Sequence, residues 1–317
     1  MAQPRVEVEV EGRRLSLSNL DKPLYPTGFT KADVISYYTA IAPAMLPHLQ
    51  ARALTRKRYP DGSEGPSFFE KRAPSHTPDW VPTVELPVSA DGSRWGGTSR
   101  RRTGVELVPF VVAEDLPTLV WLANLACLEL HTPMARAVED PDTPTMVVFD
   151  LDPGAPATAV DCARVALWLR EVLAGLDLEC VVKSSGSKGL QVYLPLNTPG
   201  VTGGATKDFA QAMAQVLERR HPDQVVSQQA KPRRTGKVLV DWLQNETFKT
   251  TVCAYSLRAR PRPAVSTPLG WDEVSDLADG GDPDAVMCPP DEVVDRMKRY
   301  GDLFAGAVDI HQELPRL

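Results

Sequence analysis

One stretch of the chain reads Met146-Val147-Val148-Phe149-Asp150-Leu151-Asp152-Pro153-Gly154. Its apolar residues predict a buried strand, which Pro-Gly ends sharply. Side chains at positions i and i+2 of a strand point to the same face, so Asp150 and Asp152 project side by side while Leu151 faces the core. Two adjacent carboxylates are costly unless a cation neutralises them, and Mg²⁺ is usually shared between carboxylates and substrate phosphates. The stretch therefore favours a metal site for phosphoryl transfer.

A simpler explanation of these aspartates stays open at this point. Asp-x-Asp after a strand is also ordinary loop chemistry, because Asp side chains bend and cap the chain. A second apolar stretch, Val238-Leu239-Val240, is predicted as a strand and is followed by Asp241. Alone, Asp241 is more typical of a cap at a strand end. Together, three strand-borne aspartates favour a catalytic set of metal ligands.

The composition is that of an ordinary globular enzyme. The 317 residues are 43% hydrophobic and 24% charged, which allows one large domain or two modest ones. No apolar stretch is long enough to span a membrane, and the N-terminus has no apolar core typical of a signal peptide. The five cysteines stand singly, which argues against a zinc ribbon and a disulfide framework. We expect a reduced, cytoplasmic protein with no membrane partner.

Charges are segregated along the chain. The net charge of −6 counts against a nucleic-acid binder, for which a basic domain is usual. Acidic residues concentrate in 139–142 and 272–295, however, and basic residues form four clusters: Arg56-Lys57-Arg58, Arg100-Arg101-Arg102, Lys231-Pro232-Arg233-Arg234 and Arg258-Ala259-Arg260-Pro261-Arg262. Each cluster alone is typical of a solvated surface. Together they favour a basic groove that binds nucleic acid in a salt-dependent way.

Helical and strand patterns alternate, which favours an α/β core. Apolar spacing predicts helices over 31–50, 115–131, 157–176, 204–220 and near 290–300. Strands are predicted within 5–20 and at 145–150, 180–183, 190–194 and 237–242, with an antiparallel hairpin over 180–194. The segment 51–110 is rich in Pro, Gly and Arg, and we expect surface loops and short strands there, around a site.

Three further features are candidates for a site. The loop Ser184-Ser185-Gly186-Ser187-Lys188-Gly189-Leu190 offers hydroxyls, amides and a lysine to a phosphate, although it lacks the P-loop spacing and a plain hairpin turn is the simpler explanation. Phe68 and Phe69 would point to opposite faces of a strand. The outward one could stack on a base, or both could be ordinary core and surface residues. His131, at the end of a predicted helix, is either a helix cap or a site residue.

Eight short motifs follow one another along the chain: Asn19-Leu20-Asp21-Lys22, Thr55-Arg56-Lys57-Arg58, Phe68-Phe69-Glu70-Lys71, His131-Thr132-Pro133, Phe149-Asp150-Leu151-Asp152-Pro153-Gly154, Ser185-Gly186-Ser187-Lys188-Gly189-Leu190, Val240-Asp241-Trp242-Leu243-Gln244-Asn245 and Tyr255-Ser256-Leu257-Arg258. As a set, they resemble the polymerase domain of the bacterial non-homologous end-joining ligase, ligase D, a branch of the archaeo-eukaryotic primase superfamily. The resemblance spans residues 14–265.

The resemblance implies a role for each of these positions. The two catalytic metal ions, Mn²⁺ or Mg²⁺, would be bound by Asp150, Asp152 and Asp241. The incoming NTP or dNTP would be contacted by Lys57, His131, Ser185, Lys188, Gln244 and Arg258, of which Ser185, Lys188 and Arg258 would meet its triphosphate. The DNA would be bound by Phe68 and Phe69 at the template base, by Asn19, Lys22 and Lys31 at the downstream 5′-phosphate, and by Arg234 near the active site.

The chain departs from that family's pattern in two places. Residue 191 is Gln where the motif is expected to carry His, and an amide can donate a hydrogen bond but cannot carry a charge. The segment between His131 and Asp150 is short, which would alter a loop over the substrate. The ligase signature Lys-x-Asp-Gly is absent, and the remaining length leaves no room for a nuclease domain. We therefore expect a stand-alone polymerase, or a polymerase domain cut from a longer protein.

These observations lead to one expected fold and one expected function. We expect an α/β (α+β) primase-polymerase domain over 1–300, with a central, mainly antiparallel sheet flanked by helices, a smaller N-terminal α/β unit, and a C-terminal tail over 301–317. We expect template-directed nucleotide addition to a primer 3′-hydroxyl at gaps and double-strand breaks. The partners would be gapped or broken DNA, Ku and a separate DNA ligase, and the protein would be associated with the nucleoid. The alternatives are a primase that starts chains without a primer, a catalytically silent module that binds 5′-phosphorylated DNA ends, and a metal-dependent nuclease.

Overall fold

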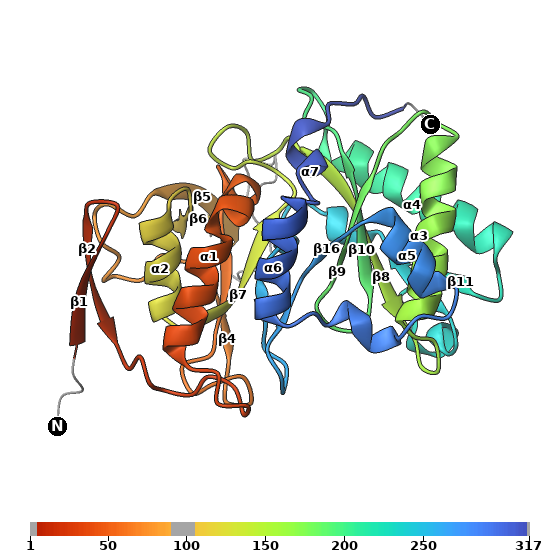
Figure 1. Ribbon diagram of the computed structural model, residues 1–317. Helices are drawn as coiled ribbons and strands as arrows, with labels where there is room; N and C mark the ends of the chain where they lie inside the picture. The colour runs from red at the N-terminus through yellow and green to blue at the C-terminus, as the bar shows by residue number, and fades with distance from the viewer. Residues whose placement is uncertain (1–4, 90–104, 316–317) are drawn as a thin grey trace.

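Two groups of helices, each with its own sheet, make up the described part of the chain, which is residues 5–89 and 105–315 of this computed structural model. On one side lie α1 (Lys31–Leu49) and α2 (Leu116–Asn124), and on the other lie α3 (Ala159–Ala174), α4 (Gly203–Arg220) and α5 (Trp271–Ala278) (Figure 1). These confirm the helices expected at 31–50, 157–176 and 204–220. The basic cluster Arg100-Arg101-Arg102 lies outside the described residues.

The larger sheet has six strands and carries the aspartates. Its strand order is β11 (Val225–Val226), β12 (Val238–Asp241), β8 (Met146–Pro153), β10 (Leu190–Pro195), β9 (Val181–Ser184) and β16 (Pro268–Leu269). The pair β11 and β12 is parallel, and the other neighbours are antiparallel. The expected central, mainly antiparallel sheet is confirmed, and so is the hairpin over 180–194.

The two faces of β8 have different surroundings, because successive side chains of a strand alternate. Val147, Phe149 and Leu151 are buried in the core that includes α3 and α4. Met146 and Val148 are buried in the other core, which includes α1 and α2. Asp150 and Asp152 continue this second face beyond its apolar residues. The alternation therefore turns both carboxylates toward the side of the molecule that carries the smaller sheet.

The smaller sheet draws on both halves of the sequence. Its order is β13 (Thr250–Val252), β7 (Cys127–Pro133), β3 (Thr55–Arg58) and β4 (Phe68–Glu70). Because β13 follows β12 in the chain, the unit expected at the N-terminus is completed by a late strand. The remaining strand pairs are β1 (Arg5–Val10) with β2 (Arg13–Ser18), β5 (Thr83–Ser89) with β6 (Val105–Val111), and β14 (Leu257–Arg258) with β15 (Ala264–Val265).

The helix predicted over 115–131 is wrong in its second half. Helix α2 ends at Asn124, and Ala126 has a positive φ of 56°, after which the chain continues as strand β7. The reason lies in the pattern from Cys127 onward, where Leu128 and Leu130 alternate with Glu129 and His131. That period of two is typical of a strand. His131 is therefore a strand residue and not a helix cap.

The C-terminal segment returns to the junction between the two halves. It contains α6 (Pro290–Tyr300), as expected, and α7 (Gly306–Asp309), and both lie between the two groups of helices in Figure 1. Phe304 is buried, and Asp302 accepts hydrogen bonds from His48 and Tyr255 at 2.8 and 2.5 Å. The short 3-10 helices are η1 (Lys231–Arg234), η2 (Leu243–Asn245) and η3 (Pro283–Val286).

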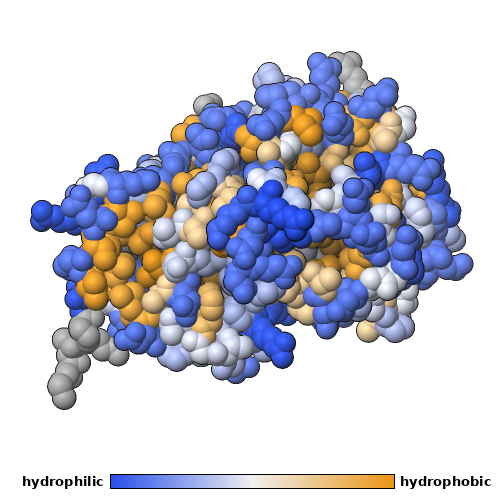
Figure 2. Space-filling view, viewed as in Figure 1, coloured by the Kyte–Doolittle hydropathy of each residue, from blue (hydrophilic) through white to orange (hydrophobic). Residues whose placement is uncertain are grey.

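The surface is mixed in character. The face seen in Figure 2 is largely hydrophilic, with an apolar area at the end that carries β1, β2 and α2. Within the described residues, no helix has the length and apolar composition needed to cross a membrane.

Candidate active site

Asp150 lies at the centre of the three aspartates. The register of the larger sheet places Asp241 directly opposite it on β12 and Gln191 directly opposite it on β10. Residues directly opposite one another on antiparallel strands have Cβ atoms about 4.5–5.5 Å apart. Asp152 follows on the same face of β8. The structure thus brings together the three aspartates that the sequence singled out.

These carboxylates repel one another. Burial and then the charge of Asp152 raise the pKa of Asp150 from 3.8 to about 7, and Asp241 adds to the rise. Burial also raises the pKa of Asp241. A set of hard carboxylate oxygens held together against this repulsion fits a divalent cation such as Mg²⁺ or Mn²⁺. The three aspartates are the residues that would hold it.

The aspartate side chains are engaged elsewhere as they stand. Asp152 Oδ2 accepts from Arg234 at 3.3 Å, and Asp241 accepts from the backbone N–H of Leu243 at 2.9 Å and from Gln244 Nε2 at 3.2 Å. Accordingly, no three His, Cys, Asp or Glu side chains in the described ranges are gathered in a metal-holding arrangement. The Asp152 side chain, which pairs with Arg234, is 54% exposed.

The Ser-Gly loop between β9 and β10 packs on the aspartate strand. A Cβ at Gly189 would lie 2.1 Å from the backbone oxygen of Leu151, and Gly186, with φ of +63°, leaves no room for a Cβ beside Arg258 and Val265. Glycine is therefore required at both positions for the backbone to approach so closely. The loop carries Ser185 and the exposed Lys188 to the edge of the aspartate site, and Arg258 lies against it.

A cavity of about 840 Å³ opens beside this loop. Its lining includes Lys188, Arg260 and Arg262, together with Ala159 at the start of α3 and one acidic residue, Asp284. Arg260 Nη2 donates a hydrogen bond to Ser187 Oγ, which links the loop to the segment after β14. Cationic side chains, hydroxyls and a helix N-terminus are all donors to an anion. The cavity can therefore take an anionic group beside the Ser-Gly loop.

A buried glutamate that the sequence analysis did not single out organises the other side of the site. Glu129, on β7, is 3% exposed, and it accepts hydrogen bonds from His131 Nε2 at 3.0 Å and from the Tyr59 hydroxyl at 3.0 Å. The backbone N–H of Ala259 also donates to it, and Arg258 Nε lies 3.6 Å away. Glu129 and His131 are two residues apart on one strand and therefore share a face. In the sequence, Glu129 could have been singled out as an acidic residue between two leucines of a strand.

Burial alone would raise the pKa of Glu129, but the hydrogen bond from His131 and the charge of Arg258 lower it to about 2. Burial lowers the pKa of His131 in spite of Glu129. At neutral pH the site therefore contains a charged carboxylate against a neutral imidazole and a guanidinium.

Aromatic and basic residues of β3 and β4 lie next to this cluster. Lys57 Nζ lies 5.3 Å from the centroid of the Phe69 ring, and the Phe69 ring packs edge-on against His131 at 5.6 Å. The expectation that one phenylalanine of the pair points inward is wrong. Phe68 is 46% and Phe69 is 59% exposed, and β4 is a three-residue strand at the edge of the smaller sheet. Both rings are available for contact.

The three residues expected at a 5′-phosphate lie together at the start of α1. The backbone N–H of Lys22 donates to Asn19 O at 3.0 Å, and the backbone N–H of Lys31 donates to Lys22 O at 2.9 Å. The Lys31 ammonium is buried and donates to Asn124 O at 2.9 Å, while the Lys22 ammonium pairs with Asp61 at 2.9 Å. Burial and the nearby charge of Lys22 lower the pKa of Lys31. The two ammonium groups thus bind different segments: Lys31 binds the end of α2, and Lys22 binds the segment after β3.

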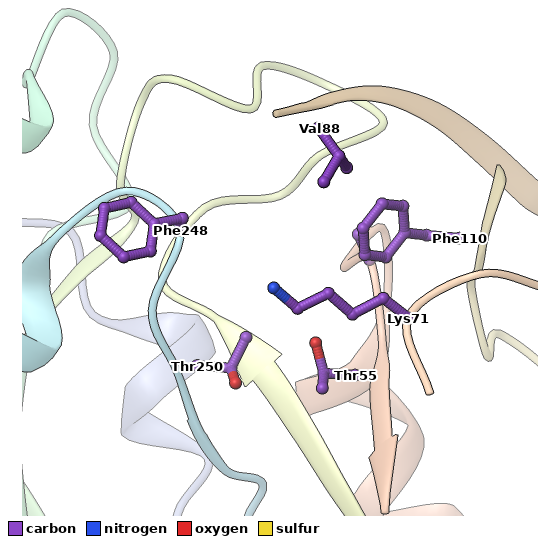
Figure 3. A pocket seen from close by; sticks show the side chains of 7 residues that line it. Thr55, Lys71, Val88, Phe110, Phe248 and Thr250 are labelled. Atoms are coloured by element: carbon purple, nitrogen blue, oxygen red, sulfur yellow. The ribbon is translucent and has the colours of Figure 1, made fainter. Parts of the chain in front are cut away.

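A second, much smaller cavity lies beside β3 and β13. It measures about 10 Å³, and the Lys71 side chain extends into it between Thr55 and Thr250, toward Phe248 (Figure 3). Burial lowers the pKa of Lys71. A space of this size holds at most about one water molecule. This cavity is therefore too small for a nucleotide.

The chain is similar to several known proteins. The family model described as LigD, primase-polymerase domain, matches residues 30–304. The multifunctional non-homologous end joining protein LigD of Mycolicibacterium smegmatis is 40% identical over 294 residues, which are 92% of this chain and 36% of that protein. The bifunctional LigD of Bacillus subtilis is 31% identical, over 92% of this chain and 44% of its own length. The chain thus spans less than half the length of these relatives.

A solved structure gives the same result. The polymerase domain from Mycobacterium tuberculosis ligase D, in complex with DNA, superposes with a TM-score of 0.82 at 36% identity, over 94% of this chain and 99% of that one. This confirms the expected fold over nearly the whole described chain. From the family model, the relatives and the shared fold, we conclude that the chain belongs to the LigD primase-polymerase domain family.

Proposed function

We propose that this protein is a DNA-repair polymerase that adds NTPs or dNTPs to a primer 3′-hydroxyl at gaps and broken DNA ends. The observation that carries the proposal is the placement of Asp241 directly opposite Asp150, with Asp152 on the same face of β8. A nuclease or a pure DNA-binding module would not need the loop donors Ser185 and Lys188 beside such carboxylates. Membership in the LigD primase-polymerase family supports the same reaction class.

Different side chains have different roles in the proposed nucleotidyl transfer. Asp150, Asp152 and Asp241 would hold two divalent ions, one bound by all three carboxylates and the other by Asp150 and Asp152. Bound Mg²⁺ or Mn²⁺ supplies Lewis-acid chemistry, which activates the 3′-hydroxyl and stabilises the leaving pyrophosphate. Lys188 and Arg258 neutralise charge that develops on the phosphates. Lys57, His131 and Gln244 orient the nucleotide, Phe68 and Phe69 stack on template bases, and Arg234 contacts DNA near the site.

The test is primer extension on a short gapped duplex with a downstream 5′-phosphate, with Mn²⁺ and either NTPs or dNTPs. We expect extension that is templated and that improves when the 5′-phosphate is present, because backbone hydrogen bonds hold Asn19, Lys22 and Lys31 next to one another. Synthesis on the same template without a primer would indicate a primase. DNA binding without any extension would contradict the proposal and favour a silent end-binding module. We further propose that Ku and a separate DNA ligase are partners in end joining.

The ion pair between Lys22 and Asp61 gives a prediction for the 5′-phosphate site. Asp61 occupies the ammonium that a phosphate would need, and the pair is partly exposed. In an Asp61→Asn protein, we expect tighter binding of 5′-phosphorylated gapped DNA by about 2- to 5-fold, the range of an exposed ion pair. Fluorescence anisotropy at fixed salt measures this, and the same duplex without the phosphate is the control. Equal gains on both duplexes would show that Asp61 acts only through general charge.

A further inference from the structure

A fully buried lysine lies beside the aspartates on the larger sheet. Lys183, on β9, is 1% exposed. Its ammonium donates hydrogen bonds to Gln191 Oε1 at 2.5 Å and to Ser266 Oγ at 2.7 Å, and both of these are neutral acceptors. None of the ion pairs between described residues includes it. Burial of a cation with neutral acceptors alone is costly, and it lowers the pKa of Lys183 to about 7.

The ammonium determines which way the Gln191 amide points. An ammonium group only donates, so the atom of Gln191 that faces Lys183 must be the carbonyl oxygen. The hydroxyl of Tyr193 donates to the same oxygen at 3.3 Å. The amide nitrogen then has one orientation left, and it donates to Asp150 Oδ1 at 3.1 Å. A flipped amide would instead place its N–H groups against the ammonium and its oxygen against a carboxylate.

We propose that Lys183 is a positioning residue for the metal site, and that Lys183 and Gln191 act as a matched pair. By fixing the amide of Gln191, Lys183 presents an N–H group to one oxygen of Asp150 and leaves the other oxygen for the divalent cation. This inference rests on the proposed function, because it assigns the aspartates to metal. A protonated histidine at position 191 would instead place a second charged donor against Lys183.

The test is Mn²⁺ binding by the metal-free protein, measured by isothermal titration for four proteins: wild type, Lys183→Met, Gln191→Met and the double variant. Loss of a residue that orients a metal ligand typically weakens binding by about 10- to 100-fold. We therefore expect the Kd to rise at least tenfold in each single variant and no further in the double variant, because both changes remove one interaction. Lys298→Met, the same change at an exposed lysine of α6, is the control and leaves the Kd unchanged.

A thermal melt separates positioning from a structural role. Removing a buried, unpaired charge leaves the Tm of Lys183→Met equal to or above that of wild type. A lower Tm with an unchanged Mn²⁺ Kd would overturn the proposal, and so would Kd changes that multiply in the double variant. If Lys183→Met does not fold, Gln191→Met, which keeps the lysine, is the test. An unchanged Mn²⁺ Kd in Gln191→Met overturns the proposal. A wild-type protein that binds no Mn²⁺ would instead refute the proposed function.

One further variant tests the pairing. An imidazole at position 191 can donate to Asp150 without an orienting ammonium. We expect Gln191→His to weaken Mn²⁺ binding when Lys183 is present, and to regain most of the wild-type affinity when combined with Lys183→Met. Failure of the second change to restore binding would show that the two positions are independent.

Discussion

An Asp150→Asn protein is expected to lose template-directed extension and to gain stability in the absence of metal. Asp150 is the carboxylate between Asp241 and Asp152, and both proposed ions depend on it. A bound metal contributes several kcal/mol of transition-state stabilisation, so we expect extension to fall by about a thousandfold or more. The free energy of unfolding should rise although activity is lost, because asparagine replaces a buried carboxylate that the neighbouring aspartates repel.

The gain in stability depends on pH in a defined direction. The pKa of Asp150 rises from 3.8 in the unfolded chain to about 7 in the folded one. The stabilisation that its proton provides is therefore fully present below pH 3.8 and is lost as the pH rises through about 7. The Asn variant has no such loss. We expect the two metal-free proteins to differ little near pH 4, and the variant to be more stable by roughly 2 kcal/mol at pH 8.

Chemical denaturation with EDTA at pH 4 and pH 8 measures this difference, and primer extension with Mn²⁺ measures the loss of activity. Asp152→Asn is the matched control: its side chain is 54% exposed, so we expect a smaller gain in stability although extension is again lost. Equal stability of wild type and Asp150→Asn at both pH values would contradict a carboxylate cluster under repulsion. Retained extension would remove Asp150 from the site.

The helices and strands whose apolar residues repeat at regular spacing could be predicted from the sequence. The strand before Asp150, the helices α1, α3 and α4, and the hairpin around the Ser-Gly loop follow from apolar spacing and turn residues. The pairing of Asp150 with Asp241 could only be suspected, because the two residues are 91 positions apart and a strand pattern does not specify its neighbour. The strand β7 was missed because its apolar run continues directly from that of α2.

The residues that orient others were the hardest to find. Glu129 and Lys183 carry no motif, and a charged residue in an apolar strand has no predicted partner until the fold is known. Glu129 acquires its function from Arg258, which is more than a hundred residues later in the chain. Such partners are set by tertiary packing, whereas the aspartates and the Ser-Gly loop carry their chemistry in local sequence.

A Glu129→Gln protein is expected to be less stable than wild type and to bind nucleotide poorly. The change keeps the shape of the side chain but removes the charge that faces Arg258 and the acceptor that holds His131. Breaking a buried ion pair on one side costs about 3–5 kcal/mol. Arg258 and His131 are the proposed contacts to the nucleotide, so loss of their anchor should raise the KM for NTP at least tenfold while the affinity for DNA stays close to that of wild type.

The pH dependence of stability tests whether the lost negative charge of Glu129 causes the loss of stability in Glu129→Gln. The pKa of Glu129 lies at about 2 in the folded protein and at 4.5 in the unfolded chain. Its stabilisation is thus fully present above pH 4.5 and is lost as the pH falls toward 2, so wild type and Glu129→Gln should differ most at neutral pH and converge in acid. Glu273→Gln is the matched control, because Glu273 pairs with Arg296 at 2.5 and 2.8 Å away from the site. The control should lose stability with no change in the KM for NTP. If Glu129→Gln behaves in the same way, Glu129 supports only the fold, and the nucleotide is held without it.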